Sequence, residues 1–171
     1  MKTCREKGFN VFNGDVSDYN SKDKFDLIIA VGVFEHIAKP LDWLQSLKSF
    51  LNYNGKIIIQ FPNIDSLNKK ISNISKHDWD MFLEPGHLYL FDHDNLNALS
   101  KKIGLKIYEK FTSTILIRGK IPFMPIRSVY LERKVQRMCR NKTFMNIYKL
   151  LLRSLDKFSG GDTVTYVLGR V

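Results

Sequence analysis

The sequence lacks any long hydrophobic segment. Its longest apolar run covers eight residues, 27–34, and includes a glycine, whereas a membrane-spanning helix needs about 20. The first seven residues contain no apolar core of a secretory signal. Cysteine is scarce, and Cys4 and Cys139 are too far apart to match a metal-binding spacing. These absences argue against a membrane-spanning or disulfide-stabilised protein, and we expect a cytoplasmic protein with reduced thiols.

Acidic residues are scarce over one stretch of the chain. The net charge is +10, and residues 118–158 hold 11 basic residues against only Glu132 and Asp156, so this stretch carries nearly all of the excess. Apolar residues recur there at helical spacing. We therefore expect a helical, basic insertion over residues 114–161. An anionic membrane surface, a nucleic acid or an acidic substrate would fit as its partner, and a helical subdomain with a solvated basic face is the alternative.

Apolar, strand-like runs alternate with helical patterns along the chain. Residues 25–31 (FDLIIAV) form a near-continuous apolar run, which is typical of a parallel strand buried on both faces. Pro40 is a favourable first residue for a helix that residues 54–55 would end, and Asp92 is the expected N-cap of another helix that ends at Gly104. The sequence therefore predicts an α/β fold with a mainly parallel sheet, whose strands cover residues 9–12, 25–31, 56–61, 106–114 and 163–171.

Four short stretches follow one another in order between residue 8 and about residue 113. They are Gly8–Val11 with Gly14-Asp15, Phe25–Ile37 (FDLIIAVGVFEHI), Leu51–Ile59 (LNYNGKIII), and Phe61-Pro62-Asn63 with Pro85–Phe91 (PGHLYLF). Together they resemble the class I methyltransferases, which use S-adenosylmethionine (SAM), in particular the ubiquinone-type and glycan-modifying branches. The resemblance implies the C-terminal part of a doubly wound, Rossmann-like sheet whose last strand is antiparallel. A domain of another α/β family, such as a dehydrogenase, is the alternative.

The same resemblance shows which part of the fold is absent from the chain. No Gly-x-Gly motif stands at a strand-to-helix junction in residues 1–171, although in this family such a loop grips the cofactor. We therefore expect residues 1–171 to be a partial, N-terminally truncated domain without its first two βα units. The absent strands would lie between strands 9–12 and 25–31. Strand 25–31 should then have an unpaired apolar edge, and strand 9–12 should pair elsewhere or attach loosely.

The resemblance also implies positions for the cofactor. Asp15 follows strand 9–12, where an acidic residue of the family accepts a hydrogen bond from the adenine amino group, and Val16 would lie against the adenine ring. The backbone of Val31 would contact the methionine part of SAM, and Gly32 would line the same crevice. For Asp15 the competing interpretation is an ordinary Gly-Asp turn.

Two histidines are the candidates for chemistry. His36 is either a general base near the methyl group or a cap of the following helix, with Glu35 facing inward as a strut. His87, at the end of the long stretch 64–90 that we interpret as a lid, either contacts the methyl acceptor or bonds to backbone. We expect no metal, because relatives that hold a cation here have a further Glu where this chain has Gly32, and because adjacent side chains diverge.

The function implied by the resemblance is SAM-dependent methyl transfer to an oxygen or nitrogen of a small-molecule, glycan or lipid-linked acceptor. Residues 118–158 would then touch the inner face of an anionic membrane peripherally. Two nucleic-acid classes are disfavoured, because the Asn/Asp-Pro-Pro-Tyr of DNA adenine enzymes is Val31–Phe34 here, and neither cysteine follows a proline as in cytosine-C5 enzymes. An RNA-directed methyltransferase and a non-catalytic remnant or binding module are the alternatives.

Overall fold

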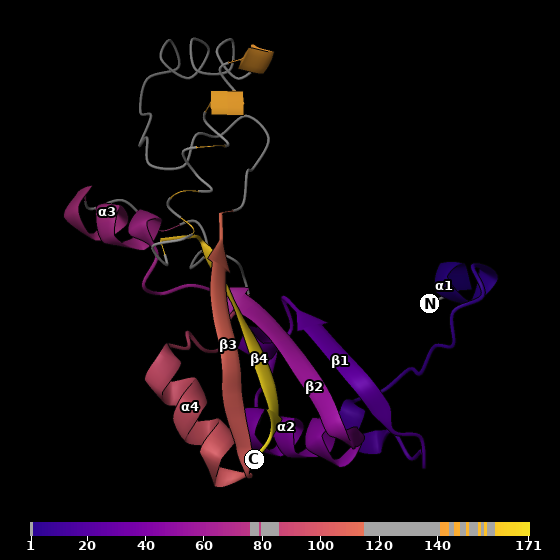
Figure 1. The fold of residues 1–171 in the computed structure, drawn as a ribbon. Helices are drawn as coiled ribbons and strands as arrows, with labels where there is room; N and C mark the ends of the chain where they lie inside the picture. The colour runs from indigo at the N-terminus through magenta and orange to yellow at the C-terminus, as the bar shows by residue number, and fades with distance from the viewer. Residues whose placement is uncertain are drawn as a thin grey trace.

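The centre of the protein is a four-stranded sheet with the strand order β1-β2-β4-β3 (Figure 1). β1 pairs in parallel with β2, whereas β4 is antiparallel to both β2 and β3. This mixed sheet with an antiparallel last strand confirms the predicted fold class. The computed structural model describes residues 2–75, Trp79, residues 86–114 and 160–171, and isolated positions between 141 and 156. The strands are β1 (Phe25–Val31), β2 (Leu51–Pro62), β3 (Leu105–Ser113) and β4 (Thr163–Arg170).

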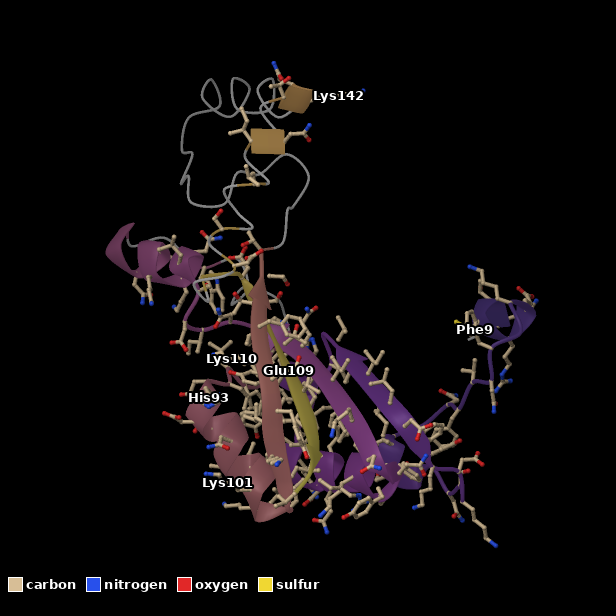
Figure 2. The ribbon with its side chains drawn as sticks, in the orientation of Figure 1. Phe9, His93, Lys101, Glu109, Lys110 and Lys142 are labelled. Atoms are coloured by element: carbon tan, nitrogen blue, oxygen red, sulfur yellow. The ribbon has the colours of Figure 1, made fainter. Side chains whose placement is uncertain are left out.

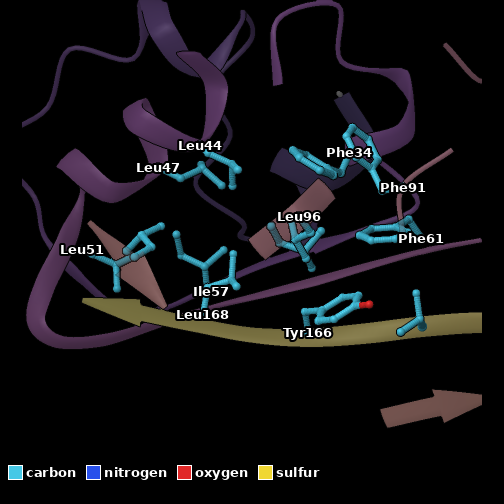
Figure 3. Packing of buried hydrophobic residues seen from close by; sticks show 13 residues of the cluster. Phe34, Leu44, Leu47, Leu51, Ile57, Phe61, Phe91, Leu96, Tyr166 and Leu168 are labelled. Atoms are coloured by element: carbon cyan, nitrogen blue, oxygen red, sulfur yellow. The ribbon is translucent and has the colours of Figure 1, made fainter. Parts of the chain in front are cut away.

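Two helices, α2 (Pro40–Ser49) and α4 (His93–Lys102), lie on one face of the sheet and enclose the core (Figure 3). The alternation of β2 explains this arrangement, because Ile57, Ile59 and Phe61 point to the same face and are all buried. Residues from both helices and from β2, β3 and β4 share one cluster. Its members are Phe34, Leu44, Leu47, Leu51, Ile57, Ile59, Phe61, Phe91, Leu96, Leu105, Val164, Tyr166 and Leu168.

The ends of α4 agree with the sequence prediction, whereas the end of α2 does not. Asp92 caps α4 as predicted, because its carboxylate accepts the Asn95 N–H at 2.7 Å, and Gly104 follows with a φ of +66°. The predicted extension of α2 to residues 54–55 is wrong, since the helix ends at Ser49. The chain there joins β2 instead, and a Cβ on Gly55 would lie 2.8 Å from the carbonyl oxygen of Phe25.

β1 is buried on one face only. Leu27, Ile29 and Val31 point away from the helices and are 50%, 60% and 57% exposed. The prediction that this strand is buried on both faces is therefore wrong, because α2 and α4 both pack on the opposite side of the sheet. Among the described residues β2 is the strand that pairs with β1. In the part of the chain that the structure describes, no strand pairs with the other edge of β1, as the sequence predicts.

The N-terminal residues lie away from the sheet. A short helix, α1 (Lys2–Glu6), precedes residues 9–12, which form no strand. Phe9 is 65% exposed and stands well outside the body of the protein (Figure 2). The prediction of a strand at residues 9–12 is therefore wrong. Of the two outcomes predicted for these residues, pairing elsewhere or loose attachment, the structure shows the second.

Two long connections follow β2 and β3. The connection predicted as a lid contains a further helix, α3 (Leu67–Ser75). The predicted basic insertion lies between β3 and β4, and its two ends meet where Ser113 pairs with Thr163. Most of residues 114–161, including most of the basic segment 118–158, lie outside the described residues. Within the described part, no helix is both long enough and apolar enough to cross a membrane.

Candidate active site at the end of the edge strand

The chain turns sharply where β1 ends. Gly32 adopts a φ of +63°, which residues with a side chain rarely take, and its N–H donates to the carbonyl of Gln60 at 3.0 Å. Val31 and Gly32 are both exposed. Ligands of open α/β sheets bind beyond the carboxyl ends of the parallel strands. These two predicted cofactor residues therefore lie at the end of the sheet where a ligand would bind.

A short 3₁₀ helix, η2 (Phe34–His36), follows this turn. The ring of Phe34 is fully buried and stacks on Phe91, with the ring centroids 4.5 Å apart. The backbone carbonyl of Glu35 accepts the N–H of Leu88 at 2.9 Å. The stacked rings and this hydrogen bond hold the end of the predicted lid against η2.

His36 is exposed on η2, and a hydrogen bond orients its ring. Its Nδ1 lies 2.8 Å from the carbonyl oxygen of Gly86, and because a carbonyl only accepts, Nδ1 donates. The lone pair of the neutral imidazole is then on Nε2, where a general base needs it. His36 does not cap α2, because the N-cap residue of that helix is Lys39. The structure therefore leaves the general-base interpretation of His36 standing.

Glu35 and His87 complete a cluster with His36. Glu35 faces inward and is only 4% exposed, which the sequence analysis expected only in the alternative where His36 caps the next helix. Its Oε1 lies 3.9 Å from Nε2 of His87, and the rings of His36 and His87 have their centroids 4.7 Å apart. One donor atom from each of the three residues lies within 4.8 Å of the other two. The side chains of Glu35 and His36 therefore converge, whereas the sequence predicts that they diverge.

Asp15 and Val16 lie in another part of the structure. Asp15 is the N-cap of a 3₁₀ helix, η1 (Val16–Asp18), and accepts hydrogen bonds from the N–H and the hydroxyl of Ser17, both at 2.9 Å. These bonds hold the pKa of Asp15 below its usual value. Val16 packs against the core, and Tyr19, just after η1, contacts Phe50 near the beginning of β1. Contact of Asp15 and Val16 with adenine stays a prediction.

Sequence reasoning missed that His87 meets Glu35 and that Gly86 orients His36. The hydrogen bond between Gly86 and His36 joins residues that are 50 positions apart, and local patterns carry no information over that distance. The usable signal is Phe91, an apolar residue just after the two. Because Phe91 belongs in the core beside Phe34, it brings Gly86 and His87 to η2.

Several solved structures share this fold. The chain matches a SAM-dependent methyltransferase from Archaeoglobus fulgidus with 18% identity and a TM-score of 0.56, over 98% of this chain and 71% of that one. It matches another SAM-dependent methyltransferase, from Thermotoga maritima, with 17% identity and a TM-score of 0.53, over 99% of this chain and 67% of that one. It also matches PKMT2 from Rickettsia typhi in complex with AdoHcy, with 14% identity and a TM-score of 0.50, over 99% of this chain and 41% of that one. No significant match was found among curated proteins.

The chain is shorter than the proteins that it resembles. It spans 38–71% of the length of these three structures and of five further ones. The sequence itself matches a family model described as a methyltransferase domain, over residues 2–110. This match covers more than half of the chain, and the protein therefore belongs to the methyltransferase domain family.

Proposed function

We propose that this chain supplies the C-terminal part of a SAM-dependent methyltransferase domain, which methylates an oxygen or nitrogen of an acceptor. The family match supports methyl transfer. The similar structure of PKMT2 was determined with AdoHcy, the product that SAM leaves after transfer. The observation that carries the proposal is the exposed turn at Val31 and Gly32, with the exposed His36 four residues further along the chain on η2.

The main chain of the turn after β1 is accessible to a ligand. Gly32 has no side chain, and the nearest side-chain atom to a Cβ built there is Glu35 Oε1 at 4.0 Å. A ligand can therefore approach the main chain at Val31 and Gly32 closely. We assign the methionine part of SAM to this position, as the resemblance implies. The sulfonium methyl would then lie on the side of η2, where His36 is exposed.

Methyl transfer from SAM is an in-line displacement at the methyl carbon. The acceptor oxygen or nitrogen forms a bond to that carbon while the carbon–sulfur bond breaks, and the electron pair stays on sulfur. The acceptor also loses a proton, and we assign its uptake to Nε2 of His36. His87 would position the acceptor beside His36, since the two rings are neighbours.

The adenine end of the cofactor is the part of the proposal that requires a rearrangement. Asp15 and Val16 would contact adenine, but η1 packs beside α2 rather than at the turn after β1. Residues 9–24 would have to follow a different path, as they would if strands stood between residues 9–12 and β1. Residues 1–171 would then be one partial domain with the basic insertion at 114–161.

The acceptor and its location form a separate part of the proposal. A small-molecule, glycan or lipid-linked acceptor is favoured over a nucleic acid, and the protein would act in the cytoplasm. The charge of residues 118–158 supports peripheral contact with an anionic membrane. Sedimentation with anionic and with neutral liposomes tests this contact. Binding that is absent, or that does not weaken with salt, would contradict it.

Calorimetric titration with SAM tests the central proposal. We expect the chain, or a longer form of it extended upstream, to bind one SAM. In the form that binds, we expect Gly32→Ala to weaken binding at least about tenfold, or 1.4 kcal/mol, because a Cβ obstructs the backbone contact. Gly104→Ala is the matched control, since Gly104 has nearly the same φ, +66°, and lies after α4. No SAM binding, either by this chain or by a longer form extended upstream, would favour the non-catalytic remnant instead.

A further inference from the structure

We propose that Glu35, His36 and His87 form a site for one divalent transition-metal ion such as Zn²⁺. Two imidazoles and one carboxylate are ligands that such ions favour, whereas Mg²⁺ and Ca²⁺ take oxygen ligands. A donor atom of each residue lies within 4.8 Å of the other two. This set differs from the cation site that the resemblance implies, because that site needs a carboxylate where this chain has Gly32.

The burial of Glu35 supplies an independent reason for a cation. The residue is 4% exposed, and within the described part of the chain its Oε2 has no hydrogen-bond partner. A buried carboxylate oxygen without a partner is destabilising. Its Oε1 is 3.9 Å from Nε2 of His87, which is longer than a hydrogen bond. An ion between these atoms would compensate the buried charge.

The distances leave room for an ion after a small adjustment. A tetrahedral ion with bonds of about 2.1 Å holds its ligand atoms about 3.4 Å apart. The donor atoms here are 3.9 Å apart for Glu35 and His87 and within 4.8 Å for the set. They must therefore approach by roughly 0.5–1.4 Å, which rotation of the three side chains can provide.

The backbone around the site is already fixed. The Leu88 N–H donates to the carbonyl of Glu35 at 2.9 Å, which holds the segment that contains His87 against η2. Nδ1 of His36 donates to Gly86 at 2.8 Å. Histidines that bind metals commonly donate their other ring N–H to a carbonyl or carboxylate in this way, which sets the tautomer and the ring orientation.

An ion at this site would serve the proposed methyl transfer. Three protein ligands leave an open coordination position, as in catalytic zinc sites, and an acceptor oxygen or nitrogen could occupy it. In the metal-free protein Nε2 of His36 would take the acceptor's proton, as proposed above. With the ion bound, that lone pair would bind the metal, and the ion would polarise the acceptor so that its proton passes to solvent water. This use of the ion rests on the proposed function, whereas the binding of the ion does not.

Titration of chelator-treated protein with Co²⁺, without SAM, tests the site. We expect one Co²⁺ per chain, detected by its visible absorption, and displacement by Zn²⁺. Glu35→Gln and His87→Gln should each weaken binding by more than the roughly 10–100-fold that loss of an outer-shell partner costs. Glu109→Gln on β3 and His93→Gln on α4 are matched controls outside the cluster (Figure 2), and they should leave the affinity unchanged.

Circular dichroism melting of each variant separates loss of a ligand from loss of the fold. Because Glu35 is buried, the Glu35→Gln variant is the one at risk of misfolding. If it does not fold, His36→Gln tests the metal site instead, because His36 is exposed. Absence of Co²⁺ binding, or equal affinity in the cluster variants and the controls, would overturn the proposal. SAM titration of the metal-free protein is a separate measurement, so failure of the metal site would not be mistaken for failure of the proposed function.

Discussion

Removing the same side chain from two neighbouring strands tests whether the outer face of β1 is open in solution. Ile29 of β1 is 60% exposed, whereas Ile59 of β2 is fully buried. Both lie in the parallel pair of strands, with Ile29 opposite Ile58 and Ile59 opposite Ala30. Ile29→Ala and Ile59→Ala delete identical atoms from the same kind of backbone. The difference between their free energies of unfolding therefore reports how far each side chain is buried.

The expected losses differ several-fold. Ile59→Ala removes a packed side chain and leaves a cavity, which costs about 2–5 kcal/mol. Ile29 is about two-fifths buried, given its 60% exposure, and full burial of such a side chain contributes about 1.5–3 kcal/mol. The Ile29→Ala variant should therefore lose about 1 kcal/mol at most, since water fills the space that the side chain leaves.

Urea unfolding followed by circular dichroism and by tryptophan fluorescence gives both free energies by linear extrapolation. Coincident transitions from the two probes show that the two-state treatment holds. Equal losses of 2 kcal/mol or more in the two variants would refute the reasoning, because they would mean that Ile29 is covered in solution. A midpoint for Ile29→Ala that rises with protein concentration would identify the cover as another copy of the chain.

Three further predictions concern single residues of the core and its ends. Burial raises the pKa of Tyr166 to about 12, so the folded state loses stability as the pH rises from about 10 towards 12, and Tyr166→Phe should reduce that loss in urea titrations. Asp92→Ala removes the cap of α4 and should cost about 1 kcal/mol of unfolding free energy, whereas Asp94→Ala should cost less. Gly55→Ala places a methyl group 2.8 Å from the carbonyl of Phe25 and should lower the thermal midpoint.

Local patterns in the sequence predicted the elements whose ends are set locally. The cap at Asp92, the positive φ at Gly104 and the start of α2 at Pro40 all follow from a residue and its immediate neighbours. The end of α2 could not be predicted in this way. Residues 51–55 could either continue the helix or pair with β1. The hydrogen bond from the Phe25 N–H to the carbonyl of Phe50 favours pairing with β1, and it joins residues too far apart for local patterns to predict.

The candidate site could be predicted only in part for the same reason. The run from Val31 to His36 lies within one stretch of sequence, and its place after a strand indicates a ligand-binding end of the sheet. The convergence of His87 with Glu35 depends on the packing of Phe91 against Phe34, which are far apart in the chain. Asp15 shows the opposite case, since a local turn motif is present but the strand that would position it has not formed.

The exposed face of β1 and the candidate site are physically connected. The exposed face of β1 consists of Leu27, Ile29 and Val31. Val31 is also the last residue of β1, directly before Gly32 and the turn to η2. Any polypeptide that pairs with the free edge of β1 would therefore also border the place assigned to SAM. If Ile29→Ala proves as costly as Ile59→Ala, the same cover would limit access to Val31, and the SAM titration of the Gly32→Ala variant would have to be interpreted with that cover in place.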